Sequence, residues 1–201
     1  MTRNELIRKY WRYYRMLEGK FRETTNYVEI DTSNFPTYSN EYAMLLQSIG
    51  AELDNVFKVY CGFNPMDRKN ITDYANYILT EYPAIVSDEI GVRGTDVKII
   101  PYQGWTATAA AQSLVWWQAF DNVKHNRNGY FVEANQGNVL KTLAALYILE
   151  MKLFTKAKKA TNPAELSDWD IPDEDSRVFL YPKWKFRCVD INDPVFDELE
   201  V

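Results

Sequence analysis

The pattern of apolar and polar residues along the chain predicts a mainly helical protein. Apolar side chains recur at intervals of three and four residues in five segments, the spacing that gives an α-helix one apolar face. The predicted helices cover residues 3–21, 39–60, 71–82, 109–127 and 132–158. Thr2 and Ser39 are suited to cap the first two of them, and Gly62 is suited to end the second.

Two other parts of the chain follow the two-residue period of β-strands. Within residues 84–102, the short β-branched stretches AIVSDEI and DVKIIPY flank Gly91 to Thr95, which predicts a β-hairpin. Near the C-terminus, VFLYPKWKFRCVDI predicts one or two further strands. We therefore expect an α+β protein that is mainly helical. Residues 1–160 form the helical domain with the hairpin inserted, and residues 161–201 form an acidic extension whose strands pack on the helices.

Length and composition fit one globular domain. The chain has 201 residues, of which 46% are hydrophobic and 25% charged, so it has enough apolar surface for a core. The sequence contains no apolar stretch of about 18 residues, and its N-terminus does not resemble a signal peptide. We expect a cytoplasmic protein that does not associate with membranes.

The net charge of −5 is unevenly distributed, with a basic N-terminal part and an acidic C-terminal part. Residues 1–22 contain seven Lys or Arg and two Glu, whereas residues 161–201 contain eleven acidic and four basic residues. A basic face on the first predicted helix suits contacts with nucleic-acid phosphates. This face consists of Arg8, Lys9, Arg12 and Arg15. The aromatic residues of the helix, Tyr13 among them, fall on its apolar arc, so a simply solvated basic face is the alternative.

The residue inventory excludes several classes of site. His125 is the only histidine, which rules out zinc centres that need two or three imidazole ligands. Cys61 and Cys188 have no Cys-x-x-Cys spacing for a zinc ribbon and form no disulfide framework. The sequence also has no glycine-rich phosphate loop, G-x-S-x-G elbow or EF-hand loop. We expect neither a metal ion nor a cofactor.

One predicted helix carries the strongest candidate for catalysis. In QSLVWWQAFDNVKHNR, residues 112–127, most of the helix surface is apolar, so its narrow polar strip must face a partner, a cleft or another subunit. The strip consists of Gln118, Asp121, Asn122 and His125. Asp121 precedes His125 by four residues, so it can contact the imidazole and prepare it for general acid–base chemistry. The alternative is a structural Asp–His pair.

Glu52 is a second anomaly, because it falls inside the apolar stripe of the helix predicted over residues 39–60. An ionised carboxylate in that position costs several kcal/mol unless it has a partner. The partners that we expect are Lys124, His125 and Arg127. Alternatively, Glu52 lies at the edge of the stripe and reaches solvent.

Three stretches together resemble the HEPN-type helical proteins of prokaryotes. They are FRETTNYVEIDTSNFPTYSNEYAMLLQSIGAELDNVFK, WWQAFDNVKHNR and ANQGNVLKTLAALYIL, all within residues 21–155. The most specific piece is the W-x-x-x-F-D-x-x-K-H-x-R pattern of residues 116–127. The resemblance implies an up-and-down bundle of four or more helices, and a homodimer with a polar site in the dimer cleft. For active members it implies metal-independent cleavage of RNA by an Arg and a His with four to six residues between them, and an acid from another helix that holds the Arg.

Part of that signature carries over to this chain. His125 matches the histidine, and Glu52 is the candidate for the acid. The arginine would stand at positions 118–120, which hold Gln, Ala and Phe. We therefore expect a dimerising interaction module that is non-catalytic or degenerate and that binds RNA or a nucleotide through the strip around His125.

Two alternatives stay open. In the first, the protein is a metal-independent endoribonuclease with His125 as the acid–base group; Lys124 or Arg127 holds the phosphate, and Asp121 or Glu52 orients the histidine. In the second, it is a structural subunit whose protein partner covers an aromatic surface, since 15% of its residues are aromatic.

Overall fold

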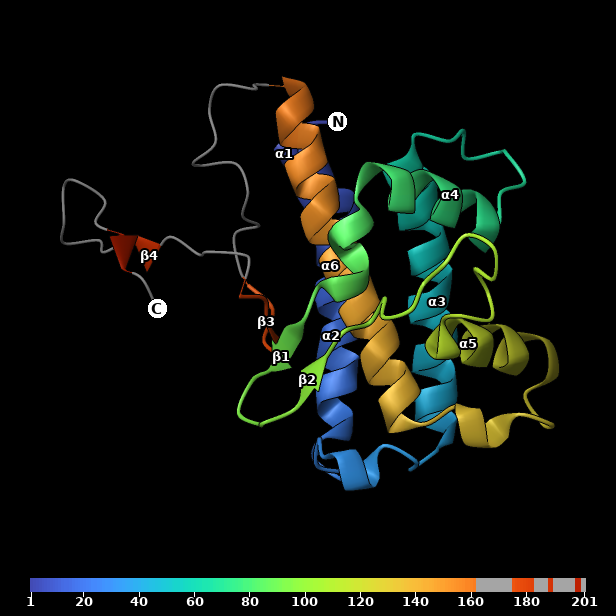
Figure 1. The fold of residues 1–201 in the computed structure, drawn as a ribbon. Helices are drawn as coiled ribbons and strands as arrows, with labels where there is room; N and C mark the ends of the chain where they lie inside the picture. Colours follow the sequence, from blue (N-terminus) through green and yellow to red (C-terminus); the bar gives the residue numbers. More distant parts are fainter. Residues whose placement is uncertain (162–174, 183–187, 190–197, 200–201) are drawn as a thin grey trace.

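Three long helical segments lie side by side in the body of the molecule (Figure 1). The N-terminal segment joins α1 (Arg3–Leu6), a π-helical turn η1 (Ile7–Trp11) and α2 (Arg12–Thr24). The other two, α3 (Asn40–Cys61) and α6 (Gln136–Thr161), run in the same direction, opposite to the N-terminal segment. The computed structural model describes residues 1–161, 175–182, 188–189 and 198–199. The prediction of a mainly helical fold with a small β accessory is confirmed.

The ends of these helices follow the predicted capping. The Thr2 hydroxyl accepts from the backbone N–H of Glu5 at 3.2 Å, and the Glu5 carboxylate accepts from the backbone N–H of Thr2 at 2.9 Å. The Ser39 hydroxyl accepts from the backbone N–H of Tyr42 at 3.1 Å. Gly62 follows α3 with a φ of 71°, a left-handed conformation that glycine adopts without a steric penalty.

The starts of α3 and α6 are tied together. A β-bridge pairs Tyr38 with Asn135, just before the two helices begin. The buried Gln136 side chain donates through Nε2 to the carbonyl oxygens of Val28 and Glu29, at 3.1 and 3.0 Å. The loop after α2 is thereby bonded to the first residue of α6, so the three long segments share one anchored end.

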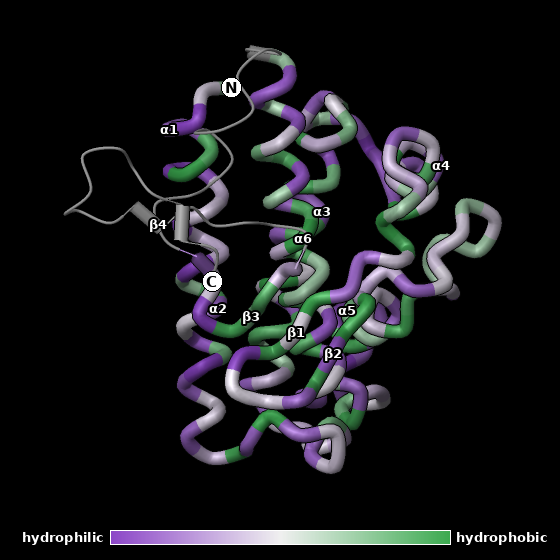
Figure 2. The backbone as a smooth tube through the Cα atoms, turned by 60° about the vertical axis from the view of Figure 1, so that its left-hand side comes forward, coloured by the Kyte–Doolittle hydropathy of each residue, from purple (hydrophilic) through white to green (hydrophobic). Residues whose placement is uncertain are grey.

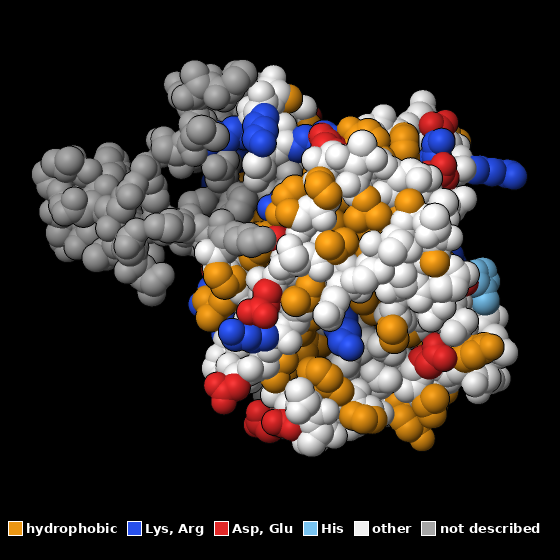
Figure 3. Space-filling view, viewed as in Figure 1, with side chains coloured by type: hydrophobic (Ala, Val, Ile, Leu, Met, Phe, Trp, Pro, Cys, Tyr) orange, Lys and Arg blue, Asp and Glu red, His pale blue; other side chains and the backbone are white. Residues whose placement is uncertain are grey.

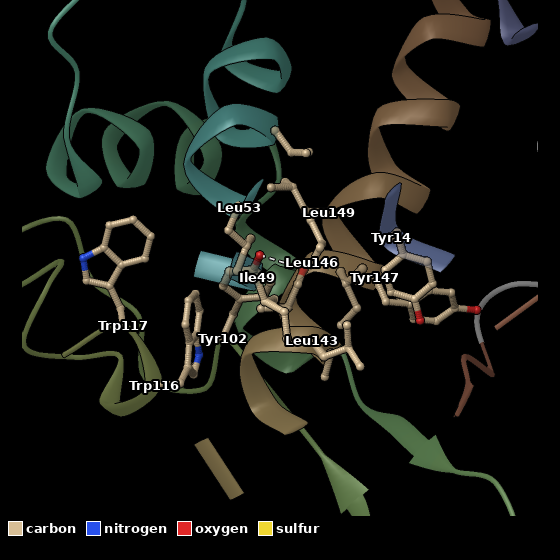
Figure 4. Close-up of a cluster of buried hydrophobic side chains, with 14 of the residues drawn as sticks. Tyr14, Ile49, Leu53, Tyr102, Trp116, Trp117, Leu143, Leu146, Tyr147 and Leu149 are labelled. Atoms are coloured by element: carbon tan, nitrogen blue, oxygen red, sulfur yellow. Dashed lines mark hydrogen bonds between the residues drawn. The ribbon is translucent and has the colours of Figure 1, made fainter. Parts of the chain in front are cut away.

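The core lies between α3, α6 and the aromatic residues that precede and begin α5 (Figure 4). Ile49 of α3 and Leu146 of α6 are fully buried in it. The hydroxyl of buried Tyr102 donates to the carbonyl oxygen of Ala145 at 2.9 Å, so a polar atom in the core has a partner. In Figure 2, hydrophobic residues are frequent along α6 and the strands, and hydrophilic residues are frequent along α2.

A small antiparallel sheet packs beside the helices. After α4 (Ile71–Glu81), strands β1 (Ile90–Val92) and β2 (Lys98–Ile99) form the predicted hairpin, and β3 (Phe179–Leu180) pairs with the other edge of β1. The residues before β1 differ from the prediction. They form a 3-10 helix, η3 (Pro83–Ser87), because proline fixes φ at a value suited to the first residue of a helical turn.

The C-terminal extension is described in part. Besides β3, it contains β4 (Cys188–Val189), which pairs antiparallel with β5 (Glu198–Leu199). Of the predicted acidic segment, residues 162–174, 183–187, 190–197 and 200–201 lie outside the described part of the chain.

The last two predicted helices begin later than expected. α5 (Val115–Asn126) starts after residue 109 because the preceding residues form turns, in which Trp105 Nε1 donates to the carbonyl oxygen of Ala110 at 3.2 Å. A 3-10 turn, η4 (Phe131–Glu133), replaces the first turn predicted for α6. α5 approaches α3 closely at Gly50, where an added Cβ would lie 2.3 Å from the Phe120 ring.

Candidate functional site

Two arginines on the N-terminal segment border a surface hollow of about 270 Å³. Arg8 and Arg12 are exposed, and among the described residues neither has an acidic partner. Asn4, Glu5 and Ile7 complete the lining of the hollow. The guanidinium groups can therefore reach an anionic ligand from solvent. We call Arg8, Lys9, Arg12 and Tyr13 the N-terminal basic surface.

The other two members of the N-terminal basic surface flank these arginines. Lys9 is exposed, and its Nζ lies 3.7 Å from Glu5 Oε1. Such an exposed i,i+4 ion pair contributes little to the free energy of unfolding. Tyr13 is 38% exposed, although the sequence pattern places it on the apolar arc. An exposed phenol next to Arg12 offers a face on which a nucleic-acid base can stack.

Arg15 does not belong to this surface, in contrast to the sequence-based expectation. Its Nη1 lies 2.8 Å from Oε2 of the buried Glu18 and also donates to the carbonyl oxygen of Asp175. The Arg15 guanidinium therefore connects α2 to the described part of the C-terminal extension.

The polar strip of α5 faces solvent. His125 Nε2 lies 3.4 Å from Asp121 Oδ1, as the spacing predicts, and the two side chains are 67% and 59% exposed. Asn122 is partly buried and donates through Nδ2 to Glu133 Oε2 at 3.0 Å, so its amide is engaged within the protein. Gln118, the first residue of the strip, is also partly buried.

The two positively charged side chains near His125 in the sequence are also exposed to solvent. Lys124 is exposed, with its Nζ 5.5 Å from the centre of the Phe120 ring, and Arg127 is exposed at the end of α5. α5, which carries the polar strip, and the N-terminal segment, which carries the N-terminal basic surface, lie apart, with α3 and α6 between them (Figure 1). Figure 3 shows the histidine, in pale blue, at the edge of the molecule. The two surfaces therefore belong to different parts of the bundle.

Glu52 is buried, but its surroundings differ from those we expected. The side chain is 8% exposed and accepts from Asn55 Nδ2 at 3.3 Å. No ion pair joins it to Lys124, His125 or Arg127 in the described structure, because the polar side of α5 faces solvent rather than α3. Burial raises the pKa of Glu52, and the bond from Asn55 opposes that rise in part.

A second acid, Glu150 of α6, lies near Glu52, and the sequence reasoning missed it. Glu150 is fully buried, and neither carboxylate oxygen has a hydrogen-bond partner among the described residues. Burial raises the pKa of Glu150 well above its ordinary value, and the charge of Glu52 adds to the rise. The pKa of Tyr10 in η1 is raised by burial and then by both carboxylates. The charges of the two acids thus influence each other and the Tyr10 hydroxyl across η1, α3 and α6.

Two further buried acids are well partnered and serve the fold. Glu18 accepts from the Tyr14 hydroxyl at 3.0 Å and from the backbone N–H of Arg177 at 2.9 Å. Asp88 accepts from the Tyr181 hydroxyl at 2.7 Å and lies 3.8 Å from Lys152 Nζ. Their bonds satisfy the carboxylates and leave Glu150 as the exception.

No helix in the described part of the chain has the length and apolar character needed to cross a membrane. No group of three or more His, Cys, Asp or Glu side chains gathers among the described residues. Comparisons of the chain with protein-family models, with curated proteins and with solved structures give no match.

Proposed function

We propose that this protein is a HEPN-like, dimerising interaction module without catalytic activity that binds RNA through the N-terminal basic surface. The observation that carries the proposal is the pair Arg8 and Arg12, which border one hollow without an acidic partner among the described residues. Positive charge on an exposed helix face attracts phosphates despite the acidic total of the chain. Tyr13 adds a stacking surface, which favours single-stranded RNA.

Binding of a short labelled single-stranded RNA, measured by fluorescence anisotropy over roughly 50–200 mM salt, tests the proposal. The parent is expected to bind with an affinity that falls as salt rises. The double variant Arg8→Gln/Arg12→Gln is expected to bind roughly 10- to 30-fold more weakly and to lose about 1.4 from the slope of log affinity against log salt, since each contact to a single strand contributes about 0.7.

The matched control is Arg68→Gln/Lys98→Gln, which removes two exposed positive charges elsewhere and changes the net charge by the same amount. It is expected to bind like the parent. Equal weakening by both double variants would mean that only total charge matters, and a parent that does not bind RNA at low salt would rule the proposal out. Tyr13→Ala, at matched thermal stability, separates stacking from phosphate contacts.

The second candidate function is metal-independent cleavage of RNA at His125. The observation that favours it is the 3.4 Å contact of Asp121 Oδ1 with His125 Nε2 on an exposed face, where a substrate can reach the imidazole. Lys124 and Arg127 are the nearby cations on the same exposed end of α5, and the absence of arginine from positions 118–120 weighs against it.

Cleavage of single-stranded and structured RNAs in the presence of EDTA decides between binding and catalysis. If the protein is an endoribonuclease, His125→Ala lowers the cleavage rate by about 10²–10⁴-fold while the melting temperature stays unchanged, because the side chain is exposed. Under our main proposal, the parent leaves every RNA intact, and His125→Ala binds RNA as the parent does.

A further inference from the structure

Asp175 binds a cluster of donors at the start of the C-terminal segment, residues 175–181, which lies between α2 and β1 (Figure 2). Its carboxylate accepts from Arg93 Nη2, from the Tyr147 hydroxyl at 3.1 Å and from the backbone N–H of Ser176 at 2.6 Å. Tyr147 is 1% exposed, so the surrounding core fixes the position of its hydroxyl. A guanidinium, a hydroxyl and a backbone N–H are also the donors that bind phosphate oxygens.

The donors of this cluster remain able to bind an anion when the Asp175 carboxylate is removed. An arginine side chain stays protonated in proteins. Burial raises the pKa of Tyr147, so its hydroxyl keeps its proton and can donate. The Arg93 side chain is also fixed by other bonds, because its Nε donates to the carbonyl oxygens of Ser176 and Phe179 at 2.9 and 3.0 Å. The cluster is therefore organised in advance for an anionic ligand.

The cluster adjoins the N-terminal basic surface. Arg15 donates to the carbonyl oxygen of Asp175, and it follows Arg12 by three residues on α2, a spacing that makes two side chains neighbours on a helix. Arg15 is ion-paired with the buried Glu18 at 2.8 Å, whereas the Arg93 side chain is 37% exposed. Arg93 is therefore the cation of the cluster that an external ligand can reach.

We propose that Arg93, Tyr147 and the backbone N–H of Ser176 form a binding site for an RNA phosphate, which the Asp175 carboxylate occupies as an internal substitute. The inference rests on the proposed function, because it extends the N-terminal basic surface by one phosphate contact. A carboxylate on the same chain competes at a high effective concentration. The parent therefore binds RNA more weakly than its basic residues allow.

Asp175→Ala vacates the site and tests the inference by RNA binding. The variant is expected to bind single-stranded RNA roughly 3- to 10-fold more tightly than the parent, through one added charge-assisted contact. The slope of log affinity against log salt is expected to steepen by about 0.7, the contribution of one contact to a single strand. Adding Arg93→Gln is expected to cancel both effects. Asp96→Ala, which removes an exposed acid from the same hairpin, is the charge-matched control and is expected to bind like the parent.

An engineered disulfide keeps the C-terminal segment in place during these measurements. Gly91 of β1 pairs with Leu180 of β3, and an added Cβ at Gly91 would lie 3.8 Å from the Leu180 Cβ, a separation that suits a disulfide. All chains therefore carry Gly91→Cys and Leu180→Cys, with Cys188→Ser to prevent mispairing. The gain from Asp175→Ala is expected to be equal in the oxidised and the reduced protein. A gain that disappears on oxidation would mean that the whole segment has to leave, and would overturn the inference.

Inorganic pyrophosphate probes the site without RNA. In chains that also carry Arg8→Gln and Arg12→Gln, the melting temperature with Asp175→Ala is expected to rise with the logarithm of the pyrophosphate concentration. Without Asp175→Ala it is expected to stay constant. Pyrophosphate binding by a protein that binds no RNA would refute the proposed function and leave the phosphate site standing. RNA binding by the parent, with no effect of Asp175→Ala on either ligand, would overturn the inference and leave the proposed function standing.

Discussion

Glu18→Ala is expected to destabilise the protein by about 3–5 kcal/mol, the cost of breaking a buried charged network by removing one partner. The carboxylate is 1% exposed and accepts from the Tyr14 hydroxyl and from the backbone N–H groups of Arg177 and Val178, at 3.0, 2.9 and 3.1 Å. Without it, the two backbone N–H groups lose a buried acceptor, and the Arg15 guanidinium loses its ion pair with a buried carboxylate.

Urea denaturation followed by circular dichroism measures this loss, and limited proteolysis measures release of residues 175–181. Glu23→Ala is the matched control, since Glu23 is an exposed acid on the same helix and its loss should change the stability by less than about 0.5 kcal/mol. A Glu18→Ala variant that unfolds at the same urea concentration as Glu23→Ala would show that Glu18 does not hold the C-terminal segment.

Trp116→Ala is expected to cost about 3–5 kcal/mol, as for other truncations of large aromatic residues in cores. Trp116 is 2% exposed, and its ring packs edge-on against Tyr102 with centroids 5.9 Å apart (Figure 4). Its Nε1 also donates to the carbonyl oxygen of Pro101 at 2.6 Å. The alanine variant loses the packing and leaves a buried carbonyl without its donor.

Trp116→Phe separates these two contributions, because it keeps an aromatic ring and removes the donor. It should cost less than the alanine variant, about 1–3 kcal/mol. Val115→Ala, at the neighbouring position that is 63% exposed, serves as the control and should be close to neutral. Equal unfolding midpoints for Trp116→Ala and Val115→Ala would contradict the assignment of Trp116 as the anchor of α5.

The sequence predicts the helices well where the signal is local. The caps at Thr2 and Ser39 and the left-handed Gly62 are determined by residues within one helical turn, and all three are present. The sequence pattern places the start of α5 too early, because the small apolar residues before it have the spacing of a helical stripe. In the structure they pack in turns that Trp105 stabilises through its indole N–H.

The helical pattern of the first helix does not predict which residues at the edges of its apolar arc are buried. A helical wheel identifies an apolar arc, but its edges depend on what packs against it. Tyr13 at one edge is 38% exposed, and Glu18 toward the other is 1% exposed, since the C-terminal segment covers the side on which Glu18 lies. No local signal indicates this, because the residues that cover Glu18 come from the other end of the chain.

The buried acids show the same limit for the candidate site. Glu52 was identified because a charge interrupts an apolar stripe, and Glu150 carries a comparable signal within the apolar run ALYILEMKLF. That the two acids lie near each other depends on α3 and α6 running in the same direction from a shared start at Tyr38 and Asn135, which periodicity does not encode.

The bonds between Glu18 and the C-terminal segment also determine when folding can finish during synthesis. Ser176, which donates to Glu18, follows it by 158 residues. At about 5–20 residues per second, the ribosome needs roughly 8–30 s to add these residues. Similarly, Arg93 can pair with Asp175 only after a further 82 residues have been synthesised. α2 is therefore synthesised before α3 and α6 but completes its native contacts only after the segment around Ser176 has been made, and the partly folded chain is open to chaperones and proteases in that interval.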